Sequence, residues 1–125
     1  MSIITKQNKQ TVAMKISKVA DTPTKENPHN VDVRLLYNKD TAQALHMLLA
    51  PGESLKPHKT PVDVFFFVIE GTPDILLGEE KVRVKANSLI DSPKDIIHCI
   101  YNNTDSIVRI LVVKAPKPLT STKIL

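Results

Sequence analysis

The sequence predicts an all-β, single-domain fold of the sandwich or barrel type. Short apolar or alternating segments recur at intervals of roughly eight to twelve residues, and clusters of turn residues such as Asn-Lys-Asp and Ser-Pro-Lys-Asp separate them. The chain has 125 residues, which is enough to close one hydrophobic core but not two. A composition of 42% hydrophobic and 24% charged residues is typical of a folded chain rather than a disordered one. We therefore treat residues 1–125 as one domain.

The expected elements follow in chain order, with residues 1–11 as a loose N-terminal arm and a barrel over about 12–115. The predicted strands are residues 11–19, 31–37, 42–50, 62–70, 73–78, 81–85, 88–92, 95–101 and 106–114. Residues 81–85 alternate polar and apolar side chains, as a half-exposed strand does. Asp40 and Thr41, just before residues 42–50, are residues that often cap the start of a helix. However, the segment runs into a turn without a residue typical of a helix end, and its neighbours are strands. We therefore predict a strand there as well.

The apolar run Val64–Ile69 has no polar position on either face. Such a strand needs cover on both sides, from another sheet or from a second subunit. Edge strands also need protection from unwanted pairing. We therefore expect a homodimer.

Charge and composition indicate neither a nucleic-acid partner nor a membrane one. Much of the positive excess behind the net charge of +4 lies near the two ends of the chain, and the interior mixes signs, as in Gly-Glu-Glu-Lys. A nucleic-acid surface needs clustered Lys or Arg with aromatic platforms, and the chain has no Trp. No apolar run is long enough for a signal peptide or a bilayer span. One cysteine fits a reducing compartment, so we expect a cytoplasmic protein.

Two motifs carry a more specific resemblance. In the first, Gly52 is followed at regular spacing by His58, Thr60, Val64 and Gly71. This spacing resembles the first motif of the cupin superfamily, which runs Gly, five residues, His-x-His, three or four residues, Glu, six residues, Gly. His58 takes the first histidine position, whereas Thr60 and Val64 stand where the second histidine and the glutamate are expected.

The second motif lies in residues 87–102. The cupin pattern of Gly, five residues, Pro-x-Gly-x-x-His, three residues, Asn is similar to Asn87, Pro93, Asp95, His98 and Asn102. Proline, histidine and asparagine keep their spacing, and both glycines are replaced. The resemblance covers about residues 42–114 and implies a cupin-type double-stranded β-helix, or jelly-roll barrel, which as a fold hosts many unrelated activities.

The resemblance implies a metal site of three histidines and one carboxylate, and here it is reduced. Only His58 and His98 remain at matching positions, while a threonine hydroxyl is a poor donor to a transition metal and valine is none. His46 becomes a third candidate ligand if even-numbered residues of its strand point inward. A divalent transition metal is therefore an alternative, and no cofactor is firmly implied. His29 is interpreted as a loop residue, and Cys99 as a buried packing residue on the face opposite to His98.

Alternation along the strands gives the expected pocket: His58, Thr60, Val64, Phe66, His98 and Ile100, with His46 as a further candidate. A mainly apolar cavity with a few convergent polar groups is the usual make-up of a small-molecule site. The first hypothesis is therefore a barrel that binds a small organic ligand with little or no metal. The alternative is a metal-dependent enzyme, an oxygenase or isomerase acting on a small acid or sugar. A third hypothesis is a structural or regulatory partner protein that acts through the outer face of the apolar strand.

Overall fold

The computed structural model describes residues 10–125. Its elements are a short 3-10 helix, η1 (Val19–Asp21), and ten strands: β1 (Asp32–Lys39), β2 (Ala42–Leu49), β3 (His58–Lys59), β4 (Asp63–Glu70), β5 (Asp74–Leu77), β6 (Glu80–Arg83), β7 (Leu89–Ser92), β8 (His98–Tyr101), β9 (Val108–Ala115) and β10 (Lys123–Ile124). Across these residues no helix has the length and apolar character that a membrane crossing requires. The all-β prediction is confirmed, including the strand at residues 42–49.

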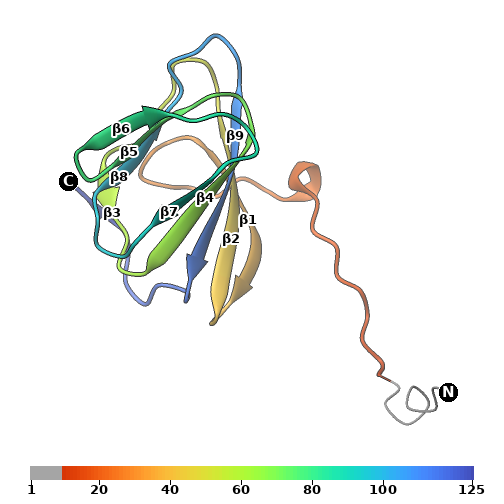
Figure 1. Ribbon diagram of the computed structural model, residues 1–125. Coiled ribbons are helices and arrows are strands. Elements are labelled where there is room, and N and C mark those ends of the chain that lie inside the picture. Colours follow the sequence, from red (N-terminus) through yellow and green to blue (C-terminus); the bar gives the residue numbers. More distant parts are fainter. Residues whose placement is uncertain (1–9) are drawn as a thin grey trace, which may run out of the picture.

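The strands form two five-stranded sheets that face each other as a jelly roll (Figure 1). One sheet has the order β1-β2-β9-β4-β7 and is called here sheet A; the other, sheet B, has the order β10-β3-β8-β5-β6. Every strand pairing within the two sheets is antiparallel. The last strand of the chain therefore closes one edge of sheet B, next to β3.

The core lies between the sheets, and side-chain alternation decides which residues enter it. In β4, Val64, Phe66 and Val68 are buried, while the residues between them are only partly covered. Strand β9 buries its even-numbered apolar residues, and β2 buries its odd-numbered ones, because antiparallel partners in register present matching faces. The side chains of the two inner faces meet to form one hydrophobic cluster.

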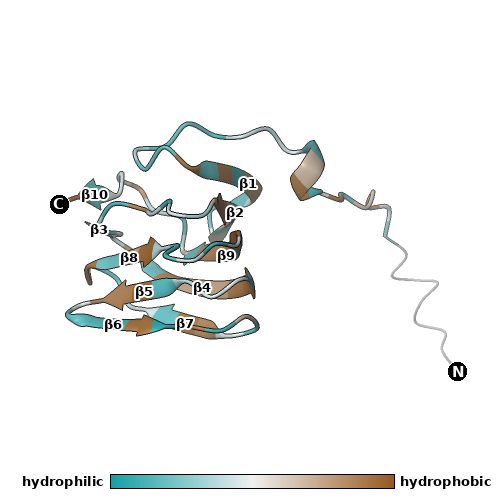
Figure 2. Cartoon of the chain, turned by 90° about the horizontal axis from the view of Figure 1, so that it is seen from above, coloured by the Kyte–Doolittle hydropathy of each residue, from teal (hydrophilic) through white to brown (hydrophobic). Residues whose placement is uncertain are grey.

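The predicted strand at residues 11–19 is wrong. Residues 10–18 have no regular structure, and their alternating Val12, Met14 and Ile16 are 80%, 84% and 71% exposed. Alternation favours a strand only where a neighbouring strand accepts its hydrogen bonds, and this segment extends away from the barrel (Figures 1 and 2). The expected arm at residues 1–11 lies mostly outside the described residues.

Arg34 fixes the point where this segment reaches the barrel. Its Nη1 donates to the backbone carbonyl oxygens of Val19 (2.8 Å) and Thr22 (3.2 Å), and Asp32 pairs with its Nε at 3.0 Å. Charge-assisted hydrogen bonds of this kind are the stronger class. Arg34 thus attaches the segment around η1 to β1, the first strand of the two sheets, which begins at Asp32.

The turns explain how the two motifs tolerate their substitutions. Gly52 and Gly71 have φ values of +84° and +85°. Asn87 and Asp95, which replace the glycines of the second motif, also have positive φ, at 67° and 62°. Asparagine and aspartate enter this region more readily than other side chains. The substitutions therefore preserve the backbone path of the motif.

Candidate functional site

A cavity of about 300 Å³ opens between the two sheets. Five of the seven residues expected there line it: His58, Thr60, Val64, Phe66 and His98. Its apolar wall is completed by Val33, Leu45, Met47, Leu55 and Val112. Segments from both ends of the described chain, residues 25–29 and residues 118–122, surround the mouth. The cavity is therefore apolar in its depth and polar along one side and at the mouth.

His58 and His98 come together because they are register partners of β3 and β8. Their ring centroids are 4.4 Å apart, with an interplanar angle of 69°. The Nδ1 of His58 lies 2.6 Å from the carbonyl oxygen of Lys56, to which it donates. In the neutral ring this leaves a lone pair on Nε2 for a ligand. Burial lowers the pKa of His58, so the neutral form is favoured near pH 7.

His98 is held on both ring nitrogens. Ser92 Oγ lies 2.6 Å from its Nδ1, and Thr60 Oγ1 lies 3.2 Å from its Nε2. Phe66 packs against the ring at a centroid distance of 5.1 Å. Burial, followed by the positive charges of His58, Lys114 and His29, lowers the pKa of His98 to about 3. The ring is thus a neutral, fixed part of the cavity wall.

His29 belongs to the site, and its interpretation as a loop residue alone was wrong. Its ring centroid lies 4.6 Å from that of His58, and its Nδ1 accepts a hydrogen bond of 2.9 Å from the backbone N–H of Lys56. The neutral ring therefore carries its proton on Nε2 and presents a donor. Burial, then the charge of His58, lowers the pKa of His29 to about 4. No local pattern marks this residue, since the contact spans 27 positions in the sequence.

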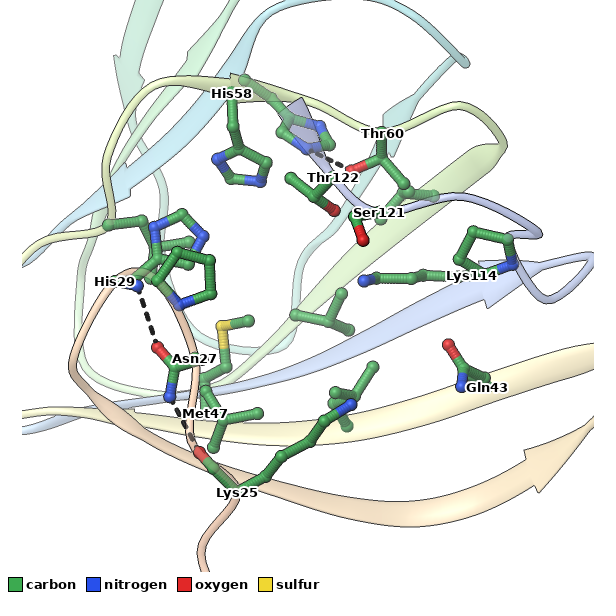
Figure 3. Close-up of a pocket in the computed structure, with 18 of the residues that line it drawn as sticks. Lys25, Asn27, His29, Gln43, Met47, His58, Thr60, Lys114, Ser121 and Thr122 are labelled. Atoms are coloured by element: carbon green, nitrogen blue, oxygen red, sulfur yellow. Dashed lines mark hydrogen bonds between the residues drawn. The ribbon is translucent and has the colours of Figure 1, made fainter. Parts of the chain in front are cut away.

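Lys114 is the second functional residue that sequence reasoning missed. It continues the inward row Val108, Ile110 and Val112 of β9, and Figure 3 shows its amine directed into the cavity. Its register partner on β4 is Val64, the position where the cupin motif has a glutamate. Burial, followed by the nearby charge of Lys25, lowers the pKa of Lys114. Side-chain alternation along residues 106–114 places Lys114 on the same face as Val108, Ile110 and Val112, so the sequence contained the information needed to predict its direction.

His46 and Ile100 do not line the cavity, which corrects the expected pocket. Leu45 and Met47 point into it, so His46 between them faces the outer side of sheet A, where Arg109 Nε donates to its Nε2 at 3.1 Å. Ile100 points inward but lies deeper, fully buried opposite Ile75 in the packed core. The cavity thus ends at the level of His98 and Phe66.

The residues of the cavity do not fit the metal site that the resemblance implies. Within residues 10–125 no group of three or more His, Cys, Asp or Glu side chains is arranged to hold a metal ion. Both nitrogens of His98 are engaged, His46 faces away, and Val64 supplies no charge. Lys114 adds a cation in the same space, which opposes the binding of another. We derive no chemistry through a metal at this site.

Asn102 and Cys99 have structural roles. The Asn102 amide donates to the carbonyl oxygens of Leu49, Ala50 and Ser106 at 3.0, 3.1 and 2.8 Å, and so ties two loops at one end of the barrel. Cys99 is fully buried, and its Sγ donates to the carbonyl oxygen of Leu55 at 3.2 Å. Burial raises the pKa of the Cys99 thiol, so it is a packing residue as expected.

Comparison with protein families identifies the class. Residues 45–114, more than half of the chain, match the family described as cupin domain. The chain therefore belongs to the cupin family, as its two motifs and its jelly roll indicate.

A relative with a solved structure is similar to most of this chain, but its name gives no function. Uncharacterized protein MJ0764 of Methanocaldococcus jannaschii is 29% identical over 87 residues, which cover 69% of this chain and 75% of that protein. Its crystal structure, described as a RmlC-like cupin with a double-stranded β-helix fold, has a TM-score of 0.70 at 23% identity and covers 85% of this chain and 94% of that chain.

Two further solved structures share the fold. The protein TT1209 of Thermus thermophilus has a TM-score of 0.72 at 24% identity, covering 84% of this chain and 100% of that chain. The polyketide cyclase RemF of Streptomyces resistomycificus has a TM-score of 0.78 at 18% identity, covering 90% of this chain and 86% of that chain. At these identities the likeness shows the fold alone, and the function has to be argued from the cavity.

Proposed function

We propose that this protein binds a small organic acid in its barrel cavity, without a metal. The observation that carries the proposal is the amine of Lys114, which lies in an apolar cavity beside Val64 and forms no ion pair within the described chain. A buried charge is costly unless it is paired. A ligand carboxylate supplies the missing partner.

The other polar groups of the cavity fit such a ligand. Lys25 lies at the mouth and adds a second positive charge, and Glu26 is the one carboxylate among the lining residues. The Nε2–H of His29 can donate to a carboxylate oxygen, while the lone pair of His58 Nε2 can accept from a ligand hydroxyl. The apolar wall suits a short hydrocarbon body. A volume of about 300 Å³ is at the small end of ligand pockets.

Substitution of Lys114 tests the proposal. The Lys114→Met variant is expected to bind probe carboxylates such as benzoate, hexanoate and salicylate at least about tenfold more weakly, because a tenfold change corresponds to about 1.4 kcal/mol, the scale of one partly buried charge contact. The measurement is isothermal titration calorimetry.

The Lys114→Arg variant serves as the matched control, since it keeps the charge and is expected to retain most of the affinity. Benzamide and hexanamide have the same apolar bodies without the charge. Equal binding of acids and amides, or unchanged binding by Lys114→Met, would contradict the proposal.

We propose in addition that two chains pair through the outer face of sheet A. The outward residues Phe65 and Val113 form a surface with Leu89, which is 57% exposed, and the carboxylates of Asp63 and Asp91 lie beside these apolar side chains. The apolar segment at residues 12–16 also finds no cover within the described chain. Large exposed apolar surfaces of this kind mark interaction sites.

Light scattering measures the proposed assembly directly. The expected mass is that of two chains, and Phe65→Glu is expected to yield a folded single chain, since a charge at the centre of an apolar interface is left unpaired. Val82→Glu, at a residue 48% exposed on the other sheet, is the matched control and should leave the mass unchanged. A wild-type protein that is monomeric at about 50 μM, a concentration at which weak dimers with micromolar dissociation constants are populated, would overturn the proposal.

A further inference from the structure

The surroundings of Lys114 favour a chemical role beyond charge. Its side chain extends from β9 into the cavity, with Val64 beside it on β4 and Gln43 beside it on β2. Val112 lies two positions earlier on the same strand face, and the depth of the cavity is apolar. Lys25 lies close enough to act on it electrostatically. Desolvation in an apolar pocket and a neighbouring cation are the two conditions that turn a lysine ammonium into a nucleophilic amine.

Resting on the proposed function, we propose that Lys114 forms a reversible imine with the carbonyl group of a small oxo acid. A simple acid presents its carboxylate to Lys114, whereas an oxo acid has a second polar group to place. Its carboxylate is held by Lys25 and the Nε2–H of His29, near the mouth, and its carbonyl carbon lies toward the amine of Lys114. This assignment uses both lysines of the cavity, one as a charge and one as a nucleophile.

The step balances without an oxidant or a reductant. The lone pair of the Lys114 nitrogen attacks the carbonyl carbon, a C–N bond forms, and the carbonyl oxygen becomes a hydroxyl. That oxygen then leaves as water with the two hydrogens of the neutral amine, and a C=N bond remains. Because the pKa of Lys114 is lowered, a larger share of the amine is in the neutral form that the attack requires.

The cavity also contains a group able to receive the proton that an ammonium must lose first. His58 donates from Nδ1 to the carbonyl oxygen of Lys56, so its Nε2 lone pair is directed to accept. His98 is unsuited to the task because both of its nitrogens are bonded to hydroxyl groups. Of the two histidines on β3 and β8, only His58 therefore has a ring nitrogen free to exchange a proton with a group in the cavity.

Reductive trapping tests the inference. The full-length protein is incubated with pyruvate, a 2-oxo acid, or acetoacetate, a 3-oxo acid, in the presence of sodium cyanoborohydride, which reduces an imine to a stable secondary amine. Intact-mass and peptide mass spectrometry then locate the adduct. We expect Lys114 to be labelled at least about tenfold faster than any other lysine, since a bound oxo acid presents its carbonyl carbon to this amine at a high effective concentration.

Lys114→Arg is the decisive variant, because it keeps the charge and cannot form an imine. It is expected to lose the specific adduct, and thermal denaturation verifies that it is folded. Labelling spread evenly over the lysines, or an adduct that persists in Lys114→Arg, would overturn the imine proposal. If carboxylates bind but no adduct forms at Lys114, the imine proposal fails and the proposed function stands; if carboxylates do not bind either, both fail.

Discussion

Replacing Gly71 with alanine is expected to lower the free energy of unfolding by about 2–6 kcal/mol. A Cβ at this position would lie 2.5 Å from the backbone carbonyl oxygen of Ile107 and 2.9 Å from Cγ2 of Val108, and the φ of +85° is unfavourable for any L side chain. The backbone strain contributes about 1–3 kcal/mol, and the crowding of a packed core adds about 1–3 kcal/mol. Urea denaturation measures the loss.

Gly52→Ala separates the two contributions. Its φ of +84° is nearly the same, but nothing lies within 4 Å of the added Cβ. This variant is expected to lose only the strain contribution, about 1–3 kcal/mol. Equal losses in the two variants would show that the contact with Ile107 does not determine the cost at Gly71.

Acidification is expected to destabilise the protein between about pH 6.5 and pH 3. The pKa of His98 is about 3 in the folded chain, against 6.5 as its ordinary value. Below pH 6.5 His98 therefore binds a proton in the unfolded chain but not in the folded chain. The stability that is present at neutral pH is lost as the pH falls. His98 alone contributes up to about 1.4 kcal/mol per pH unit. His29, with a pKa of about 4, acts in the same direction.

Denaturation curves at several pH values compare the wild type with His98→Asn. The amide can donate and accept hydrogen bonds near Ser92 and Thr60 but cannot take up a proton in this range. The variant is expected to be less stable at pH 7 and to show a shallower loss of stability on acidification. Identical slopes for the two proteins would mean that His98 is not the group that titrates.

Most of the fold could be predicted from the sequence because it depends on local patterns. Apolar runs and period-two alternation identified β1, β2 and the strands from β4 to β9, but not the two-residue strands β3 and β10. The two cupin motifs located turns near the cavity. The failure at residues 11–19 has a physical cause: the alternating pattern is present, but no strand of the described chain pairs with it. An alternating pattern shows that a segment can form a strand, but it does not show whether a neighbouring strand is available to pair with it.

The site was less predictable because part of it depends on distant contacts. Side-chain alternation within the two motifs correctly places five residues in the cavity: His58, Thr60, Val64, Phe66 and His98. The orientation of His46 could not be read from a strand that is apolar on both faces, and the structure turns it outward. His29 reaches the cavity only through the folded path of residues 25–30. Lys114 was accessible to the same alternation argument as the motif residues, but it belongs to neither motif.

The mouth of the cavity is built from the two peripheral stretches of the described chain, and they are lightly attached. Strand β10 pairs with β3 over only two residue pairs, and His29 is tied to Lys56 by a single hydrogen bond. Segments with so few bonds open at a small fraction of the free energy that unfolds the whole protein. For a ligand of the proposed kind, we therefore expect entry and release through brief opening of these two segments while the sheets stay intact. Substitutions in residues 25–29 or 118–122 are then expected to change how long such a ligand stays bound and which ligands enter, while the stability of the two sheets is unchanged.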